Sequence, residues 1–194
     1  AGLHLRLLNR IPSARGLGSS AAARVGGMLA ANALLGEPLS REQLLNMAVR
    51  LEGHPDNVAP ALFGGLVVAS FQDGQVQYRR IEVMDGLTAV LAIPDFELAT
   101  RAAVEALPAL IPVKDAVFNI GQACLLVAGF MTGDWDQVGQ AMQDRVHQPF
   151  RQSLIPGLNE VLAAARQQGA LGAALSGAGP TVLALTAADK RDQL

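Results

Sequence analysis

The sequence predicts an α+β protein with two domains, at residues 1–85 and 86–194, and three patterns lead to this prediction. A strand-like alternation at 4–10 is followed by a glycine-rich loop at 15–20 and by a helix dense in small residues that ends near Gly36. Two β-rich runs flank the turn dipeptide Asp73-Gly74 and predict a hairpin. The second half mixes strand and helix patterns, which is typical of an α+β sandwich.

The remaining elements follow from local signals. Ser40 and Gln43 have the spacing of a capping box and predict a helix at 41–52. The boundary between the two domains is expected near 84–87. The run at 87–94 is typical of a buried strand that opens the second domain. Further helices are expected at 100–107, 113–131, 135–147 and 156–168, two strands at 170–177 and 181–186, and the start of a helix in the charged tail at 187–194.

Composition excludes several classes of protein. The 194 residues are 51% hydrophobic and 16% charged, with a formal net charge of −2, so a packed core is expected and nucleic acid is not an expected partner. Cys124 is the only cysteine, which rules out a disulfide within one chain. Because it lies in an apolar helical pattern, we expect it to be a buried hydrophobe in a reducing cytoplasm.

Membrane insertion is not expected either. Gly, Pro or charge interrupts each apolar run before it reaches the roughly 20 residues that span a bilayer. The first residues, AGLHLRLLNRIP, lack the parts of a signal peptide and resemble a strand already under way, so the sequence is expected to begin within a domain. These features predict a cytoplasmic protein with no membrane partner.

The glycine-rich loop Gly16-Leu17-Gly18-Ser19-Ser20 lies between the predicted strand and helix. Free N–H groups at a helix start attract an anion, glycines let the main chain approach phosphate oxygens, and two hydroxyls can bind phosphate or metal. The loop has neither the GK[ST] of a Walker loop nor the third glycine of the dinucleotide fingerprint. A purely structural helix cap is the alternative.

The longer string PSARGLGSSAA at 12–22 resembles the PxxxGLGSSAA signature of the GHMP kinases. This resemblance implies a two-domain fold, with an N-terminal βαβ-type domain that carries the phosphate loop and a C-terminal ferredoxin-like α/β sandwich. It also implies that the loop wraps the phosphates of ATP. The nucleotide-binding residues would be Pro12, Ala14, Arg15, Gly16, Leu17, Gly18, Ser19, Ser20 and Ala21.

A second polar cluster is EGHPDN at 52–57, at the expected end of a helix. Glu52 as an exposed helix residue, His54 as a loop histidine, and Asp56 or Asn57 as a helix cap are the simpler interpretations. A zinc site is not expected, because the chain has only three histidines and no HExxH or CxxC spacing. Mg²⁺ prefers a few oxygen ligands together with substrate phosphate, and one carboxylate and one hydroxyl can supply them.

The string EGHPDNVAPA before Phe-Gly-Gly is similar to the homoserine kinase branch of the GHMP kinases. The resemblance implies that Ser20 and Glu52 bind Mg²⁺ and that His54, Asp56 and Asn57 line the homoserine pocket. Asp56 matches a general base of mevalonate-type relatives. Its role as a base stays open here, because Asn57 orienting the acceptor hydroxyl is an alternative.

Three C-terminal segments extend the resemblance. SGAGPT at 176–181 is similar to the third GHMP motif, which would add Gly177 and Gly179 to the substrate site; a hairpin turn is the simpler interpretation. DRVHQPFR at 144–151 matches a segment whose arginine, here Arg151, binds the substrate carboxylate; the alternative is a surface arginine.

PDFELAT at 94–100 matches a segment whose threonine, here Thr100, lies near the reacting phosphate; on its own, Thr100 is a candidate N-cap. The family has a second substrate arginine four residues later, where this chain has Val104. Arg101 is the nearest guanidinium that could replace it.

Together these resemblances imply transfer of phosphate from Mg-ATP to homoserine in threonine biosynthesis, with Asp56, Asn57 and Thr100 as catalytic residues. The N-terminal segment and the last strands and helix of the family are expected to lie outside this sequence. The alternatives are another GHMP small-molecule kinase and a catalytically silent ligand-binding domain. A homodimer is left open.

Overall fold

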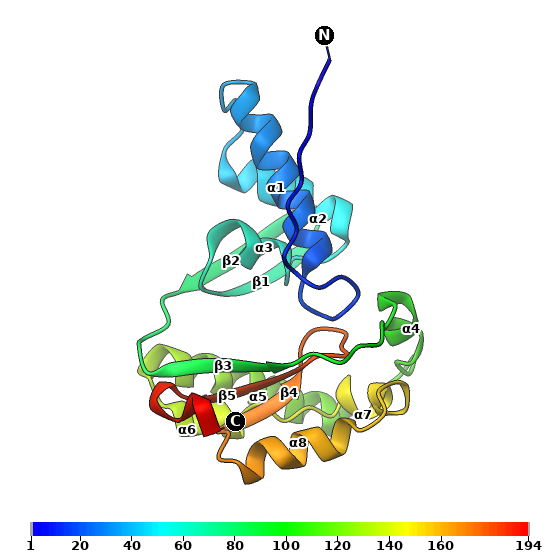
Figure 1. Ribbon diagram of the computed structural model, residues 1–194, viewed down its shortest axis with the longest axis vertical. Helices are drawn as coiled ribbons and strands as arrows, with labels where there is room; N and C mark the ends of the chain where they lie inside the picture. The colour runs from blue at the N-terminus through cyan, green and yellow to red at the C-terminus, as the bar shows by residue number, and fades with distance from the viewer. Residues whose placement is uncertain (1, 194) are drawn as a thin grey trace. The chain divides into compact units, whose positions relative to one another are not determined.

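A computed structural model describes residues 2–193 of the chain (Figure 1). The chain divides into two compact units, which we call the first unit (Ala1–Ser13 and Gly18–Arg80) and the second unit (Ala14–Leu17 and Ile81–Leu194). Arg15, Gly16 and Leu17 of the glycine-rich loop therefore belong to the second unit. The assignment of functional domains to 1–85 and 86–194 stays a prediction.

The first unit consists of three helices and a two-stranded hairpin. The helices are α1 (Ser19–Leu34), α2 (Arg41–Glu52) and α3 (Val58–Phe63), and the hairpin strands are β1 (Leu66–Gln72) and β2 (Gln75–Ile81). Small side chains on α1 let the three helices pack closely around one apolar core. Its buried residues are Ala21, Val25, Leu44, Leu45, Ala48, Val49, Val58, Ala59 and Leu62.

Both ends of α2 have the expected local chemistry. The amide of Gln43 donates to the hydroxyl of Ser40 at 3.3 Å, and the amide of Ser40 donates to Gln43 Oε1 at 2.8 Å, which confirms the capping box. Gly53 ends the helix in the left-handed region with φ of 95°. These two signals fix the position of Glu52 at the last turn.

The strand predicted at 4–10 is wrong. Residues 2–10 form no strand or helix, and Leu3, Leu5, Leu7 and Leu8 are 70–78% exposed. An alternating sequence becomes a strand only when a neighbouring strand accepts its hydrogen bonds, and no described residue does so here. Alternation alone could not reveal this.

The second unit is built on an antiparallel sheet with the strand order β3-β5-β4. Its strands are β3 (Leu87–Ala92), β4 (Gly172–Leu175) and β5 (Val182–Ala187). Leu87 pairs with Ala187 at one end of the β3–β5 ladder and Ala92 with Val182 at the other. Helices cover one face of the sheet (Figure 1), which confirms the predicted sandwich of helices and strands.

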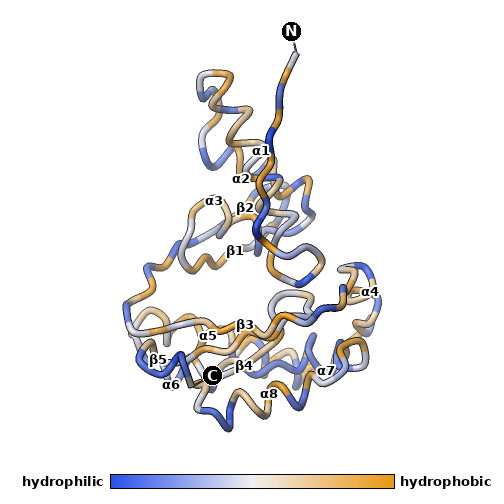
Figure 2. The backbone as a smooth tube through the Cα atoms, viewed as in Figure 1, coloured by the Kyte–Doolittle hydropathy of each residue, from blue (hydrophilic) through white to orange (hydrophobic). Residues whose placement is uncertain are grey.

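The helices of the second unit are α4 (Thr100–Glu105), α5 (Val113–Thr132), α6 (Trp135–Gln140), α7 (Gln148–Arg151) and α8 (Leu158–Gln167), with 3₁₀ turns η1 (Gln152–Leu154) and η2 (Ala188–Gln193). Figure 2 shows mainly hydrophobic residues along the strands and an alternation of hydrophobic and hydrophilic residues along α8. The buried core of this unit comprises Leu98, Ala103, Ile155, Leu158, Leu162, Ala173, Val182 and Ala184.

The helix predicted at 135–147 is shorter than expected. α6 ends at Gln140, and α7 begins after a turn that includes Asp144. The carboxylate of Asp144 accepts the amides of Val146 and His147, each at 2.9 Å, and the amide of Gln148. Asp competes for backbone N–H groups in this way, so it interrupts one helix and starts the next.

Two expectations about α5 are also wrong: that no apolar run is long enough to span a bilayer, and that Cys124 is buried. The helix has 20 residues and is mainly apolar, so by length and composition alone it could cross a membrane. Glycines within an apolar helix do not interrupt it, and its charges lie in the first turn. One such helix is weak evidence of insertion, because core helices of soluble proteins can have the same length and apolar composition. Cys124 on this helix is exposed rather than buried.

Candidate functional site

The second half of the glycine-rich loop opens helix α1 in the first unit. Gly18 is the N-cap, with φ of 70°, and it has no side chain that could cap the first N–H groups of the helix. The two serines that follow point to different partners. Ser19 Oγ lies 3.2 Å from the side-chain amide of Asn9 and 3.3 Å from the carbonyl of Ile11, so Ser19 holds the preceding segment. The uncapped N–H groups leave a favourable position for an anion.

Asn57 lies against the glycine at this helix start. A Cβ built on Gly18 would be 3.2 Å from Asn57 Oδ1, so the side chain of Asn57 lies beside the main chain of the loop. Two sequence motifs, the glycine loop and the EGHPDN cluster, are thereby brought together within the first unit.

Ser20 and Glu52 form the second link between these motifs. Ser20 Oγ donates to Glu52 Oε2 at 3.2 Å, and the side chain of Glu52 is only 10% exposed. The guanidinium of Arg24 forms an ion pair with the same carboxylate oxygen. The simpler interpretation of Glu52 as an exposed helix residue is therefore wrong.

The hydroxyl and the carboxylate supply two oxygen donors of the kind that Mg²⁺ prefers. Among residues 2–193, no group of three or more His, Cys, Asp and Glu side chains could hold a metal. A divalent ion at Ser20 and Glu52 would therefore need further oxygen ligands from phosphate or water. The donor set fits the way in which Mg²⁺ binds together with a nucleotide.

His54 and Asp56 lie together in the loop after α2. Nδ1 of His54 contacts Asp56 Oδ1, which also accepts the amide of Asn57 at 2.8 Å. The side chains remain 45% and 72% exposed. Asn57 precedes α3 without a side-chain cap bond, so its side chain does not have the capping role that was the simpler interpretation.

The first half of the glycine-rich loop is bound to the second unit. The Nε and a terminal nitrogen of Arg15 donate to the carbonyls of Pro94 at 3.0 Å and Asp95 at 2.8 Å, and Glu97 forms an ion pair at 3.5 Å. The amide of Leu98 donates to the carbonyl oxygen of Ala14 at 3.2 Å. The loop thus lies along segment 94–98, and the guanidinium of Arg15 interacts with protein groups.

The glycine turn at 176–181 holds the same half of the loop. Ser176 Oγ donates to the carbonyl of Gly16 at 2.7 Å, and the amide of Thr181 donates to the backbone carbonyl of Arg15 at 3.3 Å. A Cβ on Gly16 would lie 2.2 Å from the carbonyl oxygen of Ser176. Gly16 is therefore required for this close approach.

Arg151 is buried, with 9% of its surface exposed, so the interpretation as a surface arginine is wrong. Its Nε donates to the carbonyl of Ala103 and a terminal nitrogen donates to Gly177, each at 3.1 Å. Its other N–H groups have no hydrogen-bond partner among residues 2–193. Burial lowers the pKa of Arg151, and the charge of Asp144 opposes this shift.

Asp144 is a residue of this region to which the sequence analysis gave no role. Besides the three amides at the start of α7, it accepts Asn119 Nδ2 at 2.6 Å, and His147 Nδ1 lies 3.6 Å away. Burial by itself raises the pKa of the Asp144 carboxyl, but the hydrogen bonds from His147, Gln148, Asn119 and Val146 outweigh it and hold the pKa far below its usual range. The sequence carried no signal for this role, because Asp144 lies within the helix predicted at 135–147.

Thr100 is the first residue of α4, and the cap position belongs to Ala99, so Thr100 is not the N-cap. Arg101 Nε lies 2.7 Å from Glu105 Oε1 on the same helix, and both side chains are mainly exposed. Val104 is 57% exposed. The guanidinium proposed to replace the missing arginine is thus paired within its own helix.

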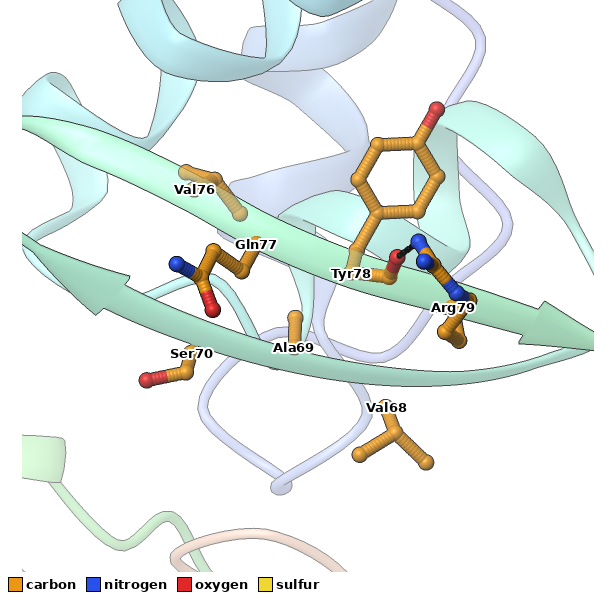
Figure 3. A pocket seen from close by; sticks show the side chains of 7 residues that line it. All are labelled: Val68, Ala69, Ser70, Val76, Gln77, Tyr78 and Arg79. Carbon is orange, nitrogen blue, oxygen red and sulfur yellow. Dashed lines mark hydrogen bonds between the residues drawn. The ribbon is translucent and has the colours of Figure 1, made fainter.

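A hollow of about 540 Å³ lies on the hairpin of the first unit, away from these motifs in sequence. Figure 3 shows its lining side chains on β1 and β2: Val68, Ala69, Ser70, Val76, Gln77, Tyr78 and Arg79. None of them is a predicted site residue, and none is a carboxylate or a histidine. We therefore do not assign the chemistry to this hollow.

Comparison with known proteins identifies the class. The family model of the GHMP kinases N terminal domain matches residues 1–65, and that of the GHMP kinases C terminal domain matches residues 122–194. The chain belongs to the GHMP kinases.

Within this class, the chain is similar to homoserine kinases. It is 54% identical to the homoserine kinase of Moorella thermoacetica over 182 residues, which are 94% of this chain and 62% of the relative. It is 49% identical to that of Halothermothrix orenii over 193 residues, 100% of this chain and 62% of the relative. The chain therefore spans about three fifths of the length of these relatives.

Solved structures agree. Homoserine kinase from Cytophaga hutchinsonii matches with a TM-score of 0.89 and 37% identity, covering 95% of this chain and 61% of that one. Mevalonate kinase of L. major, solved with R-mevalonate, matches with a TM-score of 0.74 and 25% identity, covering 94% of this chain and 60% of that one. The same fold thus serves kinases with different acceptors.

Proposed function

We propose that this chain is the nucleotide- and substrate-binding part of a homoserine kinase, which phosphorylates L-homoserine with Mg-ATP in the cytoplasm as a step of threonine biosynthesis. The observation that carries the proposal is the pair Ser20–Glu52 next to the uncapped start of α1. The identity of about half of all aligned residues with homoserine kinases supports the acceptor.

For the nucleotide, we assign the phosphates to the main chain of Pro12, of Ala14, and of the loop that continues from Arg15 to Ala21. Backbone N–H groups at a helix start stabilise negative charge as it shifts between oxygens during transfer. Arg15 contributes through its main chain in this proposal, because its guanidinium interacts with Pro94, Asp95 and Glu97.

For the metal, we assign Ser20 and Glu52 as ligands. When bound there, Mg²⁺ supplies positive charge that neutralises the phosphate oxygens. The chain contributes the orientation of the two donors: Ser20 lies in the first turn of α1, and the end of α2 fixes Glu52.

For the acceptor, we assign His54, Asp56, Asn57 and the turn glycines Gly177 and Gly179 to substrate binding. Asp56 Oδ1 is engaged by His54 and by the amide of Asn57, whereas Oδ2 has no hydrogen-bond partner among residues 2–193 and can accept from the acceptor hydroxyl. The free N–H groups of Arg151 suit a carboxylate, since guanidinium can donate two parallel hydrogen bonds. We place Thr100 near the reacting phosphate.

The reaction forms a bond between the side-chain oxygen of homoserine and the γ-phosphorus and breaks the bond from that phosphorus to the oxygen that leaves with ADP. The hydroxyl proton leaves to Asp56 or to water. Positioning and charge neutralisation lower the barrier for such a transfer, and the protein needs no covalent intermediate.

An acceptor comparison tests the proposal. ADP release is measured with homoserine, mevalonate, galactose and shikimate, and we expect turnover with homoserine alone. Turnover of another acceptor would indicate a different GHMP kinase, and ATP binding without any turnover would indicate a silent ligand-binding domain.

The metal assignment has its own test. Glu52→Gln should lower kcat by about 100-fold, the order of loss when one stabiliser of transition-state charge is removed, because an amide is a poor Mg²⁺ ligand. Glu160→Gln, the same change at an exposed position of α8, should leave kcat unchanged. Normal Mg²⁺ activation of the Glu52 variant would remove Glu52 from the metal site.

A further inference from the structure

Arg24 is a charged residue of the first unit to which the proposed function gives no role. It lies four residues after Ser20 on α1, so both side chains project from the same face of that helix. Both reach the same atom, Oε2 of Glu52, one with a hydroxyl and the other with a guanidinium. This arrangement places a positive charge of the protein on the carboxylate that we assign to the metal.

The burial of the two side chains differs. That of Glu52 is 10% exposed, whereas that of Arg24 is 40% exposed. A carboxylate so deeply buried needs a cationic partner, since the charged form loses its hydration. Among residues 2–193, Arg24 is the one basic side chain in an ion pair with Glu52.

Arginine is suited to an ion pair that can open and re-form. Its guanidinium stays protonated, so the ion pair does not dissolve through loss of a proton near neutral pH. Its long side chain is partly in solvent and can turn outward by rotation about its own bonds. The carboxylate would then exchange one cation for another.

We propose that Arg24 is the resident cation of Glu52 and competes with a divalent ion for this carboxylate. The inference rests on the proposed metal role of Glu52. The competition weakens the binding of a free divalent ion more than that of an ion bound together with a nucleotide. The phosphates of a nucleotide offer the displaced guanidinium a new anion, whereas a free ion offers none. Arg24 thereby links binding of the metal to binding of the nucleotide, as a positioning residue.

The test measures Mn²⁺ binding to the full chain without nucleotide, from the loss of the electron paramagnetic resonance signal of free Mn²⁺. Arg24→Met removes the competing charge and keeps a good helix former. We expect it to bind Mn²⁺ about fivefold more tightly, which is the strength of a partly exposed ion pair expressed as an affinity ratio. With ATP present, the gain should be smaller.

Two further variants give the controls. Arg24→Lys keeps a charge at the same place and should bind Mn²⁺ nearly as the parent does. Arg50→Met removes an exposed charge of the last turn of α2, and Arg50 forms no ion pair with Glu52 among residues 2–193. It should leave the Mn²⁺ affinity unchanged. Thermal unfolding of each variant checks that the fold is intact.

The inference is overturned if Arg24→Met leaves Mn²⁺ affinity unchanged or weakens it, if it shows no saturable Mn²⁺ binding, or if Arg50→Met tightens binding equally. The titration requires no turnover, so its result is independent of the acceptor. A chain that shows the expected Mn²⁺ affinities but does not phosphorylate homoserine keeps this inference and loses the proposed function. If homoserine is phosphorylated but Arg24→Met does not change the Mn²⁺ affinity, the proposed function stands and this inference fails.

Discussion

The hydroxyl of Ser176 donates a hydrogen bond of 2.7 Å to the carbonyl oxygen of Gly16, across 160 residues of sequence. It joins the third motif of the sequence to the first half of the glycine-rich loop, both within the second unit. The two glycines of the loop therefore have different tasks. Gly16 serves packing against a turn, and Gly18 opens a helix.

The first prediction concerns Gly16. Gly16→Ala should destabilise the chain by at least about 2 kcal/mol, because φ at this position is +73° and the new Cβ would lie 2.2 Å from the carbonyl oxygen of Ser176. Neither atom can move without breaking the turn. The free energy of unfolding, measured by urea titration, checks this.

Gly18→Ala is the matched control for this prediction. Its φ is +70°, close to that of Gly16, but its Cβ would meet only the side chain of Asn57 at 3.2 Å, which can shift. We expect a loss of about 1 kcal/mol from the backbone conformation alone. Equal losses in the two variants would contradict the packing role of Gly16.

Much of the fold was predictable, since its signals are local. The capping box of Ser40, the hairpin at Asp73-Gly74 and the sheet of the second unit lie where periodicity and turn chemistry placed them. The strand at 4–10 was not, because pairing depends on a partner strand that local sequence does not specify. The exposure of Cys124 likewise depends on which face of α5 meets its neighbours.

The candidate site was predictable in part, through motifs that resemble a family. Resemblance selected Ser20 and Glu52, and the structure brings these two side chains together. It gave no role to Arg24 or Asp144, because neither position carries a signal of its own until the partner is known. Arg151 was selected, but its two carbonyl partners come from distant segments that no spacing rule connects.

The second prediction concerns Asp144 and pH. Its pKa is depressed in the folded chain, so its carboxylate contributes stability that is complete above the unfolded pKa of about 4 and is lost as pH falls further toward the folded value. Asp144→Asn should cost roughly 1–3 kcal/mol at pH 7, since a charged acceptor of several N–H groups is lost.

Unfolding free energies of parent and variant at pH 7 and at pH 3.5 check this prediction. The difference between them should narrow at the lower pH, because Asp144 of the unfolded parent begins to bind a proton there while the folded carboxylate stays charged. Asp136→Asn, at an exposed position in the first turn of α6, should show little difference at either pH. A gap for Asp144→Asn that is independent of pH would mean that its charge does not stabilise the fold.

The third prediction concerns Arg151. Arg151→Leu should cost about 2 kcal/mol in stability, because the carbonyls of Ala103 and Gly177 lose a charged donor. If the remaining N–H groups bind the substrate carboxylate, kcat/KM for homoserine should also fall by roughly 2–4 kcal/mol of transition-state stabilisation, with ATP affinity unchanged. Stability loss with unchanged homoserine kinetics would assign Arg151 to the fold alone.

The last prediction concerns Val104, which stands where homoserine kinases are expected to have a second substrate arginine. Thr100 and Val104 are four residues apart and share one face of α4, whereas Arg101 pairs with Glu105 on an adjacent face. Val104 is 57% exposed, so the fold can accept a longer side chain. Val104→Arg should lower KM for homoserine about fivefold through one additional carboxylate contact of about 1 kcal/mol. Arg101→Leu should leave KM unchanged. A rise in KM for the Arg101 variant would show instead that Arg101 leaves Glu105 and supplies the contact itself.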